Sequence, residues 1–284
     1  MGKFFIGIDI GGSFTKAGLV QNGKVVYATR IPTKRGSLDS VLAVCDEIIA
    51  KHKDTKIDGI GVSIAGMVIQ ERILLSASNL GLPRTDVAGK LEKKYRIPTK
   101  IGNDIACYAL AEAAESKIDN LVYIAIGTGI NVGVINKGKL FSGADGTSLE
   151  YGHTCFESVC GELCACGLKG CVEQFISGNA LMALAKPNGI TASTPEEVFA
   201  ASKEIADVFL RCLLTVLLNI SNTYRPQKIF IGGGLAAMVA PYIDRLNDGL
   251  KEKHYGYKNA PVVTVEISKL SNDGAVFGAA GLWN

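Results

Sequence analysis

The fold is decided by residues 3–16, which read KFFIGIDIGGSFTK. The first half of this stretch is mostly apolar and is followed by a glycine turn at Gly11-Gly12-Ser13. A second strand-like segment follows over 15–20. This pattern predicts a buried strand, a tight turn and a second strand. Asn22-Gly23 is a typical two-residue hairpin turn, so residues 24–31 are expected to form a third strand.

Helical and strand-like segments alternate further along the chain. Apolar residues at helical spacing predict helices over 38–52, 87–95 and about 104–115. Residues 59–64 and 98–101 are expected to be strands. The mixture indicates an α/β protein.

The plan of the first hairpin returns in the middle of the chain. Gly12-Ser13 corresponds to Gly127-Thr128, and Gly23-Lys24 corresponds to Gly138-Lys139 at the same spacing. One explanation is a chance match between two unrelated hairpins. The other is an internal repeat, which predicts two homologous lobes, each a sheet flanked by helices. We expect an N-terminal lobe over 1–115, completed by a C-terminal helix at 273–284, and a C-terminal lobe over 116–272.

Composition excludes several classes of protein. Of the 284 residues, 48% are hydrophobic and 20% are charged, as in folded globular chains. The net charge of +3 gives no strongly basic face, so we expect no nucleic-acid partner. The apolar start is too short for a signal peptide, and residues 208–220 are too short for a membrane span. We therefore expect a buried helix there, no membrane contact and a cytoplasmic location.

Both glycine turns have the chemistry of a phosphate clamp. Glycine lets backbone N–H groups approach an anion closely, and a hydroxyl side chain adds a donor. Gly11-Gly12-Ser13 and Gly127-Thr128-Gly129 share these features, and Lys16 adds positive charge near the first turn. Two such turns are expected to close on one triphosphate from both sides, although either alone is also an ordinary chain reversal.

Two further features fit a nucleotide. Asp9 ends the first predicted strand, where its carboxylate is expected to hold the Mg²⁺ that accompanies ATP; a turn residue with satisfied hydrogen bonds is the alternative. Gly232-Gly233-Gly234 follows an apolar strand and precedes a predicted helix. We expect it to lie against the adenosine, or else to allow close strand–helix packing. The absence of a GxxxxGK[S/T] motif argues against a P-loop enzyme, and the absence of GxGxxG after the first strand argues against a dinucleotide oxidoreductase.

Five of the eight cysteines lie between Cys155 and Cys171. This crowding favours a metal site in a reducing compartment over a disulfide framework. Cys155 and Cys160 are competing ligands for a tetrahedral Cys₃His site, whose predicted members are His153, Cys164, Cys166 and Cys171. A closed four-ligand site leaves no position for water, so the Zn²⁺ would be structural. A set of reduced thiols is the alternative.

These motifs together resemble the ROK (repressor, open reading frame, kinase) family of bacterial sugar kinases over essentially the whole chain. The segment from Asp9 to Lys16 is similar to the family's first phosphate motif, and Gly102-Asn103-Asp104 is similar to the segment that bears its catalytic aspartate. Glu150-Tyr151-Gly152-His153 matches the family's Glu-x-Gly-His sugar motif. Residues 164–173 match its Cys-x-Cys-Gly-x-x-Gly-Cys-x-Glu zinc signature, at the spacing from His153 that the family requires.

The resemblance implies a two-lobed actin-like fold, duplicated and related to ribonuclease H, whose lobes close over ATP and a hexose in an interlobe cleft. It implies that Asp104 is the general base for the sugar hydroxyl, which suits phosphoryl transfer because that reaction needs mainly alignment and charge stabilisation. The competing role for Asp104 is the N-cap of the following helix. The implied sugar ligands are Gly66, Asn79, Asn103, Asp104, Glu150, His153 and Glu173. Without the resemblance, Glu150 and Glu173 would be interpreted as solvated surface carboxylates.

The chain departs from the family pattern at Asn131 and Val132, where the second phosphate motif usually has more glycine. The first phosphate motif begins at Asp9, so we expect no DNA-binding region before it, unlike the family's repressors. We therefore predict an ATP-dependent hexose or N-acetylhexosamine kinase of glucokinase type, acting at the 6-hydroxyl and forming a homodimer. An N-acetylmannosamine or fructose kinase is the nearest alternative. A non-catalytic sugar sensor and a zinc-stabilised scaffold are alternatives of other classes.

Overall fold

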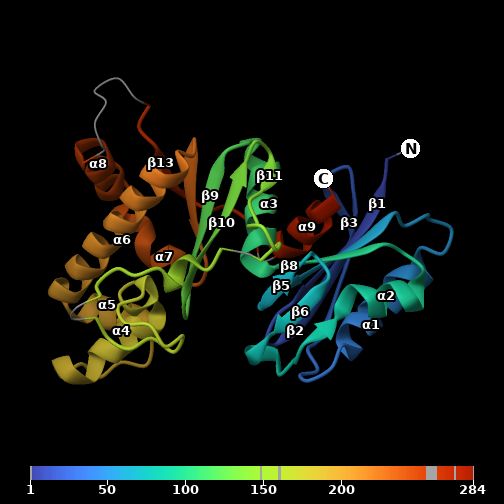
Figure 1. Ribbon diagram of the computed structural model, residues 1–284, viewed down its shortest axis with the longest axis horizontal. Helices are drawn as coiled ribbons and strands as arrows, with labels where there is room; N and C mark the ends of the chain where they lie inside the picture. The colour runs from blue at the N-terminus through green and yellow to red at the C-terminus, as the bar shows by residue number, and fades with distance from the viewer. Residues whose placement is uncertain (1, 148, 159–160, 254–260, 272, 284) are drawn as a thin grey trace. The chain divides into compact units, whose positions relative to one another are not determined.

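The computed structural model describes residues 2–147, 149–158, 161–253, 261–271 and 273–283. The chain forms two compact units (Figure 1). Unit 1 comprises Met1–Asp119, Gly133–Leu149 and Leu270–Asn284, and unit 2 comprises Asn120–Val132 and Glu150–Lys269. The chain therefore leaves unit 1 and returns to it twice.

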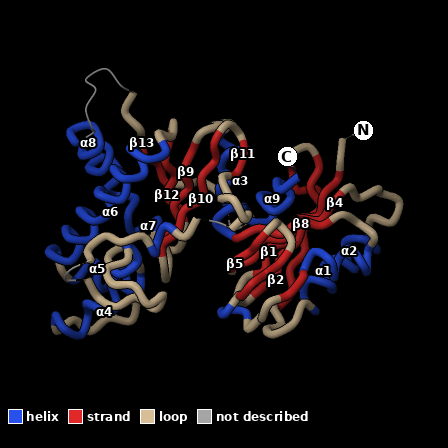
Figure 2. The backbone as a smooth tube through the Cα atoms, viewed as in Figure 1, coloured by secondary structure: helices blue, strands red, loops and turns tan. Residues whose placement is uncertain are grey.

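Unit 1 is built on a five-stranded sheet with the strand order β3-β2-β1-β4-β8. Its strands are β1 (Phe4–Ile10), β2 (Phe14–Gln21), β3 (Lys24–Pro32), β4 (Gly59–Ile64) and β8 (Thr99–Asn103). The first three are antiparallel, because short turns join them, whereas β4 runs parallel to β1 and β8 runs parallel to β4. Figure 2 shows the strands of the structure in red and the helices in blue. Every residue of β4 is buried, as expected for a central strand covered on both faces.

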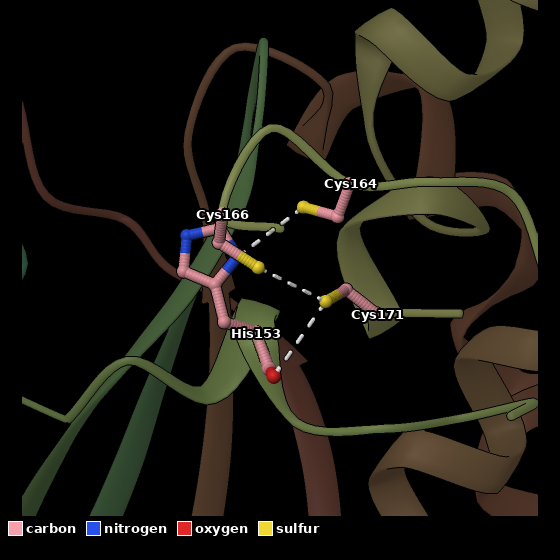
Figure 3. A group of neighbouring side chains, drawn as sticks. All are labelled: His153, Cys164, Cys166 and Cys171. Carbon is pink, nitrogen blue, oxygen red and sulfur yellow. Dashed lines mark hydrogen bonds between the residues drawn. The ribbon is translucent and has the colours of Figure 1, made fainter. Parts of the chain in front are cut away.

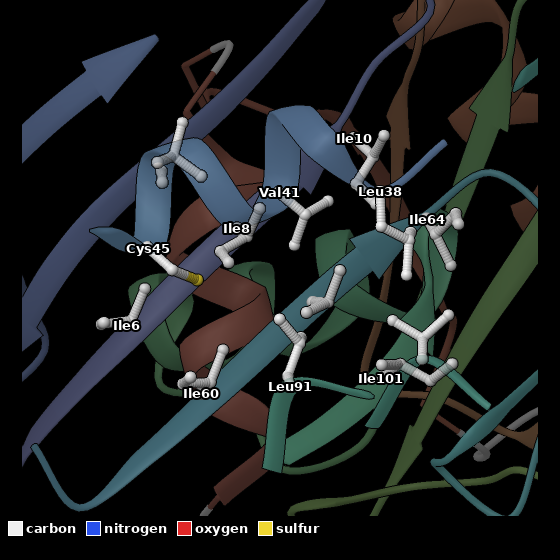
Figure 4. Close-up of a cluster of buried hydrophobic side chains, with 14 of the residues drawn as sticks. Ile6, Ile8, Ile10, Leu38, Val41, Cys45, Ile60, Ile64, Leu91 and Ile101 are labelled. Carbon is white, nitrogen blue, oxygen red and sulfur yellow. The ribbon is translucent and has the colours of Figure 1, made fainter. Parts of the chain in front are cut away.

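One face of this sheet carries branched apolar side chains. Ile6, Ile8 and Ile10 of β1 are buried together with Val41 and Cys45 of α1 (Asp39–Lys51), as Figure 4 shows. The helix α2 (Val87–Tyr95) adds Val87 and Leu91 to the same core. The predicted strand over 59–64 and the predicted helix over 87–95 coincide with β4 and α2.

The other face carries glycines, because a helix lies directly on the sheet backbone. A methyl group at Gly7 would lie 1.9 Å from the carbonyl oxygen of Val276, and one at Gly61 would lie 1.8 Å from that of Ala279. Both partners belong to α9 (Gly274–Ala280), which packs beside α3 (Asp104–Ser116). Glycine is therefore required at both positions for α9 to approach the sheet. The short helix η6 (Gly281–Trp283) then stacks Trp283 on Phe5 of β1.

A small three-stranded sheet completes unit 1. It has the order β5-β6-β7, with β5 (Met67–Ile69), β6 (Ile73–Ser76) and β7 (Thr85–Asp86). The one-turn helix η1 (Ser78–Leu80) lies between β6 and β7 in the chain. None of these elements follows from a regular pattern in the sequence, since each is too short to show one.

The second five-stranded sheet has the order β11-β10-β9-β12-β13, which repeats the order of the first. Its strands are β9 (Leu121–Ile126), β10 (Ile130–Asn136), β11 (Lys139–Leu140), β12 (Lys228–Gly232) and β13 (Thr264–Ile267). Again β10 and β11 pair in antiparallel fashion, while β9, β12 and β13 are parallel. The predicted internal repeat is confirmed by this shared strand order.

The helices of unit 2 include one long amphipathic helix, α6 (Lys203–Tyr224). Phe209, Leu213, Val216, Leu217 and Ile220 are buried along one stripe of it, at the spacing of a single helix face. The other helices are α4 (Gly178–Ala185), α5 (Pro195–Ala201), α7 (Ala236–Val239) and α8 (Ile243–Lys253). The predicted helix over 208–220 is confirmed, but it is buried along one face only, since Val208 is 39% exposed. Within the described residues no helix has the length and apolarity that crossing a bilayer requires.

Candidate active site

The first glycine turn joins β1 to β2 and leaves its outer side open. The Gly11 N–H donates to the carbonyl oxygen of Phe14 at 3.0 Å, which closes the turn. Gly12 and Ser13 are exposed, and a methyl group at Gly12 would meet no atom within 4 Å. An anion can therefore approach the backbone N–H groups of this turn without displacing a side chain.

Asp9 lies near the end of β1, beside Ser63 of β4 and opposite Lys16 of β2. The Ser63 hydroxyl donates to Asp9 Oδ1 at 3.1 Å, and Lys16 Nζ lies 3.6 Å from Asp273 Oδ1. Burial raises the pKa of Asp9 above its ordinary value of 3.8; the Ser63 hydrogen bond and the Lys16 charge lower it, and Asp273 raises it. Burial has the largest effect, so the ionised carboxylate is held at a cost that a nearby cation would offset.

Asp104, the predicted general base, is the first residue of α3 and is half-buried. The N-cap of this helix is Asn103, whose Oδ1 accepts the Ile105 N–H at 2.9 Å. The alternative that made Asp104 the cap is therefore wrong. Asn103 has the extended backbone that a cap requires, with φ −60° and ψ 147°, whereas Asp104 is already helical. A carboxylate in the first turn of a helix is stabilised in its charged form by the helix dipole.

Asn103 is buried and also contacts a second predicted sugar residue. Its Nδ2 donates to the carbonyl oxygen of Gly66 at 3.1 Å. A methyl group at Gly66 would lie 3.0 Å from Ala77 Cβ, and Asn79 is exposed in the one-turn helix η1, which follows Ala77. The structure thus brings Asn103 and Gly66 together and places Asn79 on the segment that adjoins them.

Two residues near Asp104 were not predicted from the sequence. Burial, together with the smaller effect of the charges of Asp9, Asp104 and Asp273, raises the pKa of Tyr108 to about 12. Tyr108 therefore lies within the field of three carboxylates, one of which is the predicted magnesium ligand and another the predicted base. Tyr108 follows Asp104 by one helical turn, which is a signal that the sequence contains. Nothing in the sequence links Asp273 to Lys16.

The second glycine turn, Gly127-Thr128-Gly129, joins β9 to β10. The Gly127 N–H donates to the carbonyl oxygen of Gly129 at 2.9 Å, and the Gly178 N–H donates to that of Gly127 at 2.7 Å. A methyl group at Gly127 would lie 4.0 Å from Gly234 N, so the Gly232-Gly233-Gly234 turn lies beside it. The six nucleotide residues predicted in unit 2 therefore gather where the parallel strands β9 and β12 end, the edge at which open α/β sheets bind ligands.

The predicted sugar residues of unit 2 lie in or beside two one-turn helices, and one of them, Glu173, contacts the residue that follows this turn. Glu150 precedes the one-turn helix η2 (Tyr151–His153), and the His153 N–H donates to its carbonyl oxygen at 3.0 Å. Glu173 lies on η3 (Val172–Gln174), and its Oε2 accepts the Ile130 N–H at 3.3 Å. Glu150 is exposed and Glu173 is half-buried, so only Glu150 matches the surface interpretation. Loss of surrounding water raises the pKa of Glu150 above its ordinary value of 4.5, His153 lowers it, and Glu173 raises it.

The four predicted zinc ligands converge in unit 2 (Figure 3). Their ligand atoms all lie within 4.8 Å of one another; they belong to His153, Cys164, Cys166 and Cys171. Cys164 Sγ lies 3.6 Å from His153 Nδ1, and Cys166 Sγ lies 3.5 Å from Cys171 Sγ. Zinc bonds of about 2.3 Å to sulfur and 2.0–2.1 Å to nitrogen, at tetrahedral angles, require separations of about 3.8 Å and 3.6 Å. The donor set and its spacing therefore fit a tetrahedral Zn²⁺.

Of the two competing cysteines, only Cys155 lies within the described residues, and it does not join this cluster. Cys155 is exposed and pairs through its backbone with Cys171, but its sulfur is outside the ligand group. Cys160 lies outside the described residues. Burial raises the pKa of Cys171 to about 12, whereas the Leu168 backbone N–H lowers the pKa of Cys166. A metal would be needed to hold the Cys171 sulfur as a thiolate at neutral pH.

Comparisons with known proteins agree on one family. The sequence profile of the ROK family matches residues 5–284. A glucokinase of Halalkalibacterium halodurans is 27% identical over 99% of this chain and 94% of its own length. An N-acetylmannosamine kinase of Vibrio cholerae is 28% identical over 87% of this chain and 89% of its own. A xylose repressor of Caldicellulosiruptor bescii is 25% identical over 98% of this chain and 77% of its own.

Solved structures extend the likeness to the fold. The ROK glucokinase of Streptomyces griseus, crystallised with glucose and AMPPNP, superposes with a TM-score of 0.75 at 25% identity and covers 98% of both chains. The duplicated, actin-like α/β fold predicted from the sequence is confirmed by this likeness and by the repeated strand order.

Proposed function

The chain belongs to the ROK family, and we propose that it is a sugar kinase that transfers the terminal phosphate of ATP to the 6-hydroxyl of a hexose or N-acetylhexosamine. The glucokinase and N-acetylmannosamine kinase relatives support the enzyme class and this range of acceptors. The complex of the S. griseus relative with AMPPNP supports ATP as the donor.

The observation that carries the proposal is the geometry of the sugar motif. Glu150 and His153 are joined by a backbone hydrogen bond of 3.0 Å, and Glu173 accepts the N–H of Ile130, the residue that follows the second glycine turn. Two carboxylates, each able to accept two or more hydrogen bonds, suit a ligand that presents several hydroxyl groups. Glucose and N-acetylhexosamines share that chemistry.

Each candidate residue has a definable part in the reaction. Asp104 would orient the 6-hydroxyl and accept its proton as the hydroxyl oxygen attacks the γ-phosphorus and ADP leaves. Gly12, Ser13 and Thr128 would donate hydrogen bonds to phosphate oxygens. Asp9 would hold Mg²⁺, which supplies positive charge for the phosphates when bound. The four-ligand zinc site would fix the loop that carries His153, and it has no open position for chemistry.

Replacement of Asp104 by Asn tests the proposal. The amide keeps the shape and the helix position but cannot accept a proton, so ADP release in the presence of sugar should fall by about 10²–10⁴-fold. Coupled ADP release is measured over glucose, mannose, fructose, N-acetylglucosamine and N-acetylmannosamine. Lys117→Ala, at the other end of the same helix, is the control for general damage to α3. Wild-type turnover in the Asp104→Asn protein would show that another residue is the base.

A non-catalytic sugar sensor is a second candidate, favoured by the likeness to the xylose repressor. Calorimetry separates the two functions. A kinase should bind both ATP and a sugar, whereas a sensor would bind the sugar and leave ATP unbound.

A further inference from the structure

Asn131 departs from glycine at the start of β10, and its side chain faces the sugar motif. In the internal repeat its position corresponds to Lys16, which pairs with Asp273 in unit 1. Asn131 is half-buried and forms hydrogen bonds to both residues at the start of the Glu150-Tyr151-Gly152-His153 motif. Asn131, where the chain differs from the family's motif, thus contacts Glu150, which is a proposed sugar ligand.

The orientation of the Asn131 amide is fixed by its neighbours. Two backbone N–H groups, those of Val132 and Tyr151, each point at Asn131 Oδ1 at 2.9 Å. Because an N–H can only donate, the atom that it faces must be the amide oxygen. The amide nitrogen Nδ2 is then left to donate to Glu150 Oε2, at 3.3 Å.

This single side chain therefore serves two functions at once. Its oxygen ties the backbone of Tyr151 to β10, and its nitrogen restrains the Glu150 carboxylate. Glu150 is exposed, and an exposed glutamate side chain loses rotamer entropy when its carboxylate is fixed. A binding group gains affinity when its orientation is set before the ligand arrives.

We propose that Asn131 is a positioning residue for the sugar, which holds the Glu150 carboxylate in the orientation that receives a sugar hydroxyl. The inference rests on the proposed function, because it requires Glu150 to contact the sugar. It explains the difference from the family's phosphate motif at Asn131 by sugar binding and not by nucleotide binding. Substitution should therefore raise KM for the sugar and leave KM for ATP unchanged.

The substitution Asn131→Asp separates the two bonds. Aspartate keeps an oxygen for the Val132 and Tyr151 N–H groups, but it turns a second oxygen toward Glu150. The donor is lost and two like charges face each other, so KM for the sugar should rise by about 10- to 100-fold, with KM for ATP within about twofold of wild type. Asn136→Asp, an exposed position at the far end of the same strand, is the matched control and should change neither constant.

The second variant tests whether Asn131 acts through Glu150. In a Glu150→Gln protein, the new side-chain amide can donate to the carboxylate that Asn131→Asp introduces, which restores the hydrogen bond with donor and acceptor exchanged. Adding Asn131→Asp to Glu150→Gln should therefore cost less than about twofold in KM for the sugar, or lower it. An equal cost in both backgrounds would show that Asn131 acts independently of Glu150, and a rise in KM for ATP alone would assign it to the nucleotide; either result overturns the inference.

Binding measurements keep this test independent of turnover. If the wild-type protein releases no ADP with any sugar, the proposed kinase activity fails, and the same variants are titrated with glucose and with N-acetylmannosamine by calorimetry. Weaker sugar binding by Asn131→Asp but not by Asn136→Asp would then support the positioning role. Equal binding by all three proteins, or no sugar binding by the wild type, would overturn it.

Discussion

Alanine at Gly129 tests the placement of Glu173 at the second glycine turn. Gly129 lies outside the left-handed backbone region, so its conformation suits alanine. The added methyl group would lie 2.2 Å from Glu173 Oε2, and its next two neighbours are also atoms of Glu173. Because non-bonded heavy atoms prefer separations of about 3.5–4.0 Å, the carboxylate has to retreat by more than about 1 Å.

The expected consequence is a loss of activity without a loss of fold. A misplacement of about 1 Å in a group that positions substrate costs about 100-fold, which is about 2.7 kcal/mol in activation free energy. The fold loses the 3.3 Å hydrogen bond from Ile130 N to Glu173, worth about 0.5–1.5 kcal/mol. The lower entropy of the unfolded alanine chain returns about 0.4–1 kcal/mol. The free energy of unfolding should therefore change by less than about 1 kcal/mol.

The assay is a double-mutant cycle on kcat/KM for the sugar. Gly129→Ala and Glu173→Ala are measured singly and together by coupled ADP release, with urea unfolding followed by circular dichroism. If the methyl group acts by displacing Glu173, it should cost little in the Glu173→Ala background. A full loss of about 100-fold in both backgrounds would refute the reasoning and would mean that the methyl group disturbs the phosphate turn itself.

Three further predictions concern the metal, the packing of α9 and the charge on Asp9. The purified chain should hold about one Zn²⁺ by elemental analysis, and Cys164→Ser should release it and lower the midpoint of thermal unfolding, since metal binding and folding are coupled; a zinc-free protein of unchanged stability would contradict this. Gly61→Ala places a methyl group 1.8 Å from the Ala279 carbonyl oxygen, so it should destabilise unit 1 by about 1–3 kcal/mol or more in urea, measured by the fluorescence of Trp283, the only tryptophan. Because the pKa of Asp9 is raised in the folded chain, its ionised form opposes folding at neutral pH, and this penalty disappears as the pH falls below 3.8. Asp9→Asn should therefore raise the free energy of unfolding at neutral pH but not at a pH below 3.8, while it lowers turnover with ATP. A variant that is less stable than the wild type at neutral pH would contradict this reasoning.

Local chemistry accounts for the parts of the fold that the sequence predicts well. Asn22 and Gly23 adopt φ values of 47° and 74°, which is the conformation that an Asn-Gly hairpin requires, so the strands on either side were predictable. The strand over 59–64 was also predictable, because every residue is apolar or small. The β5-β6-β7 sheet was not, since its strands are only two to four residues long and too short to show an alternating pattern.

The candidate site also contains residues that local sequence patterns predict and residues that only the structure reveals. The cysteine spacing predicted a cluster whose four ligand atoms do converge. Sequence alone left Asp104 with two roles, whereas the hydrogen bond from the Ile105 N–H and the backbone angles show that Asn103 is the cap. Asp273 and Asn131 depend on contacts with Lys16 and Glu150, partners that are distant or in another element. Such pairs have no periodicity, so a single sequence does not reveal them.

The placement of α9 on the glycine face of β1 and β4 has a consequence for biosynthesis. The strands that carry Gly7 and Gly61 leave the ribosome early, yet the helix that covers them follows residues 120–269. At about 5–20 residues per second, those residues take roughly 8–30 s to translate. During that interval the bare backbone of the central strands is open to water and to other nascent chains. This surface becomes covered only when the last segment of the chain has emerged and α9 can pack on it.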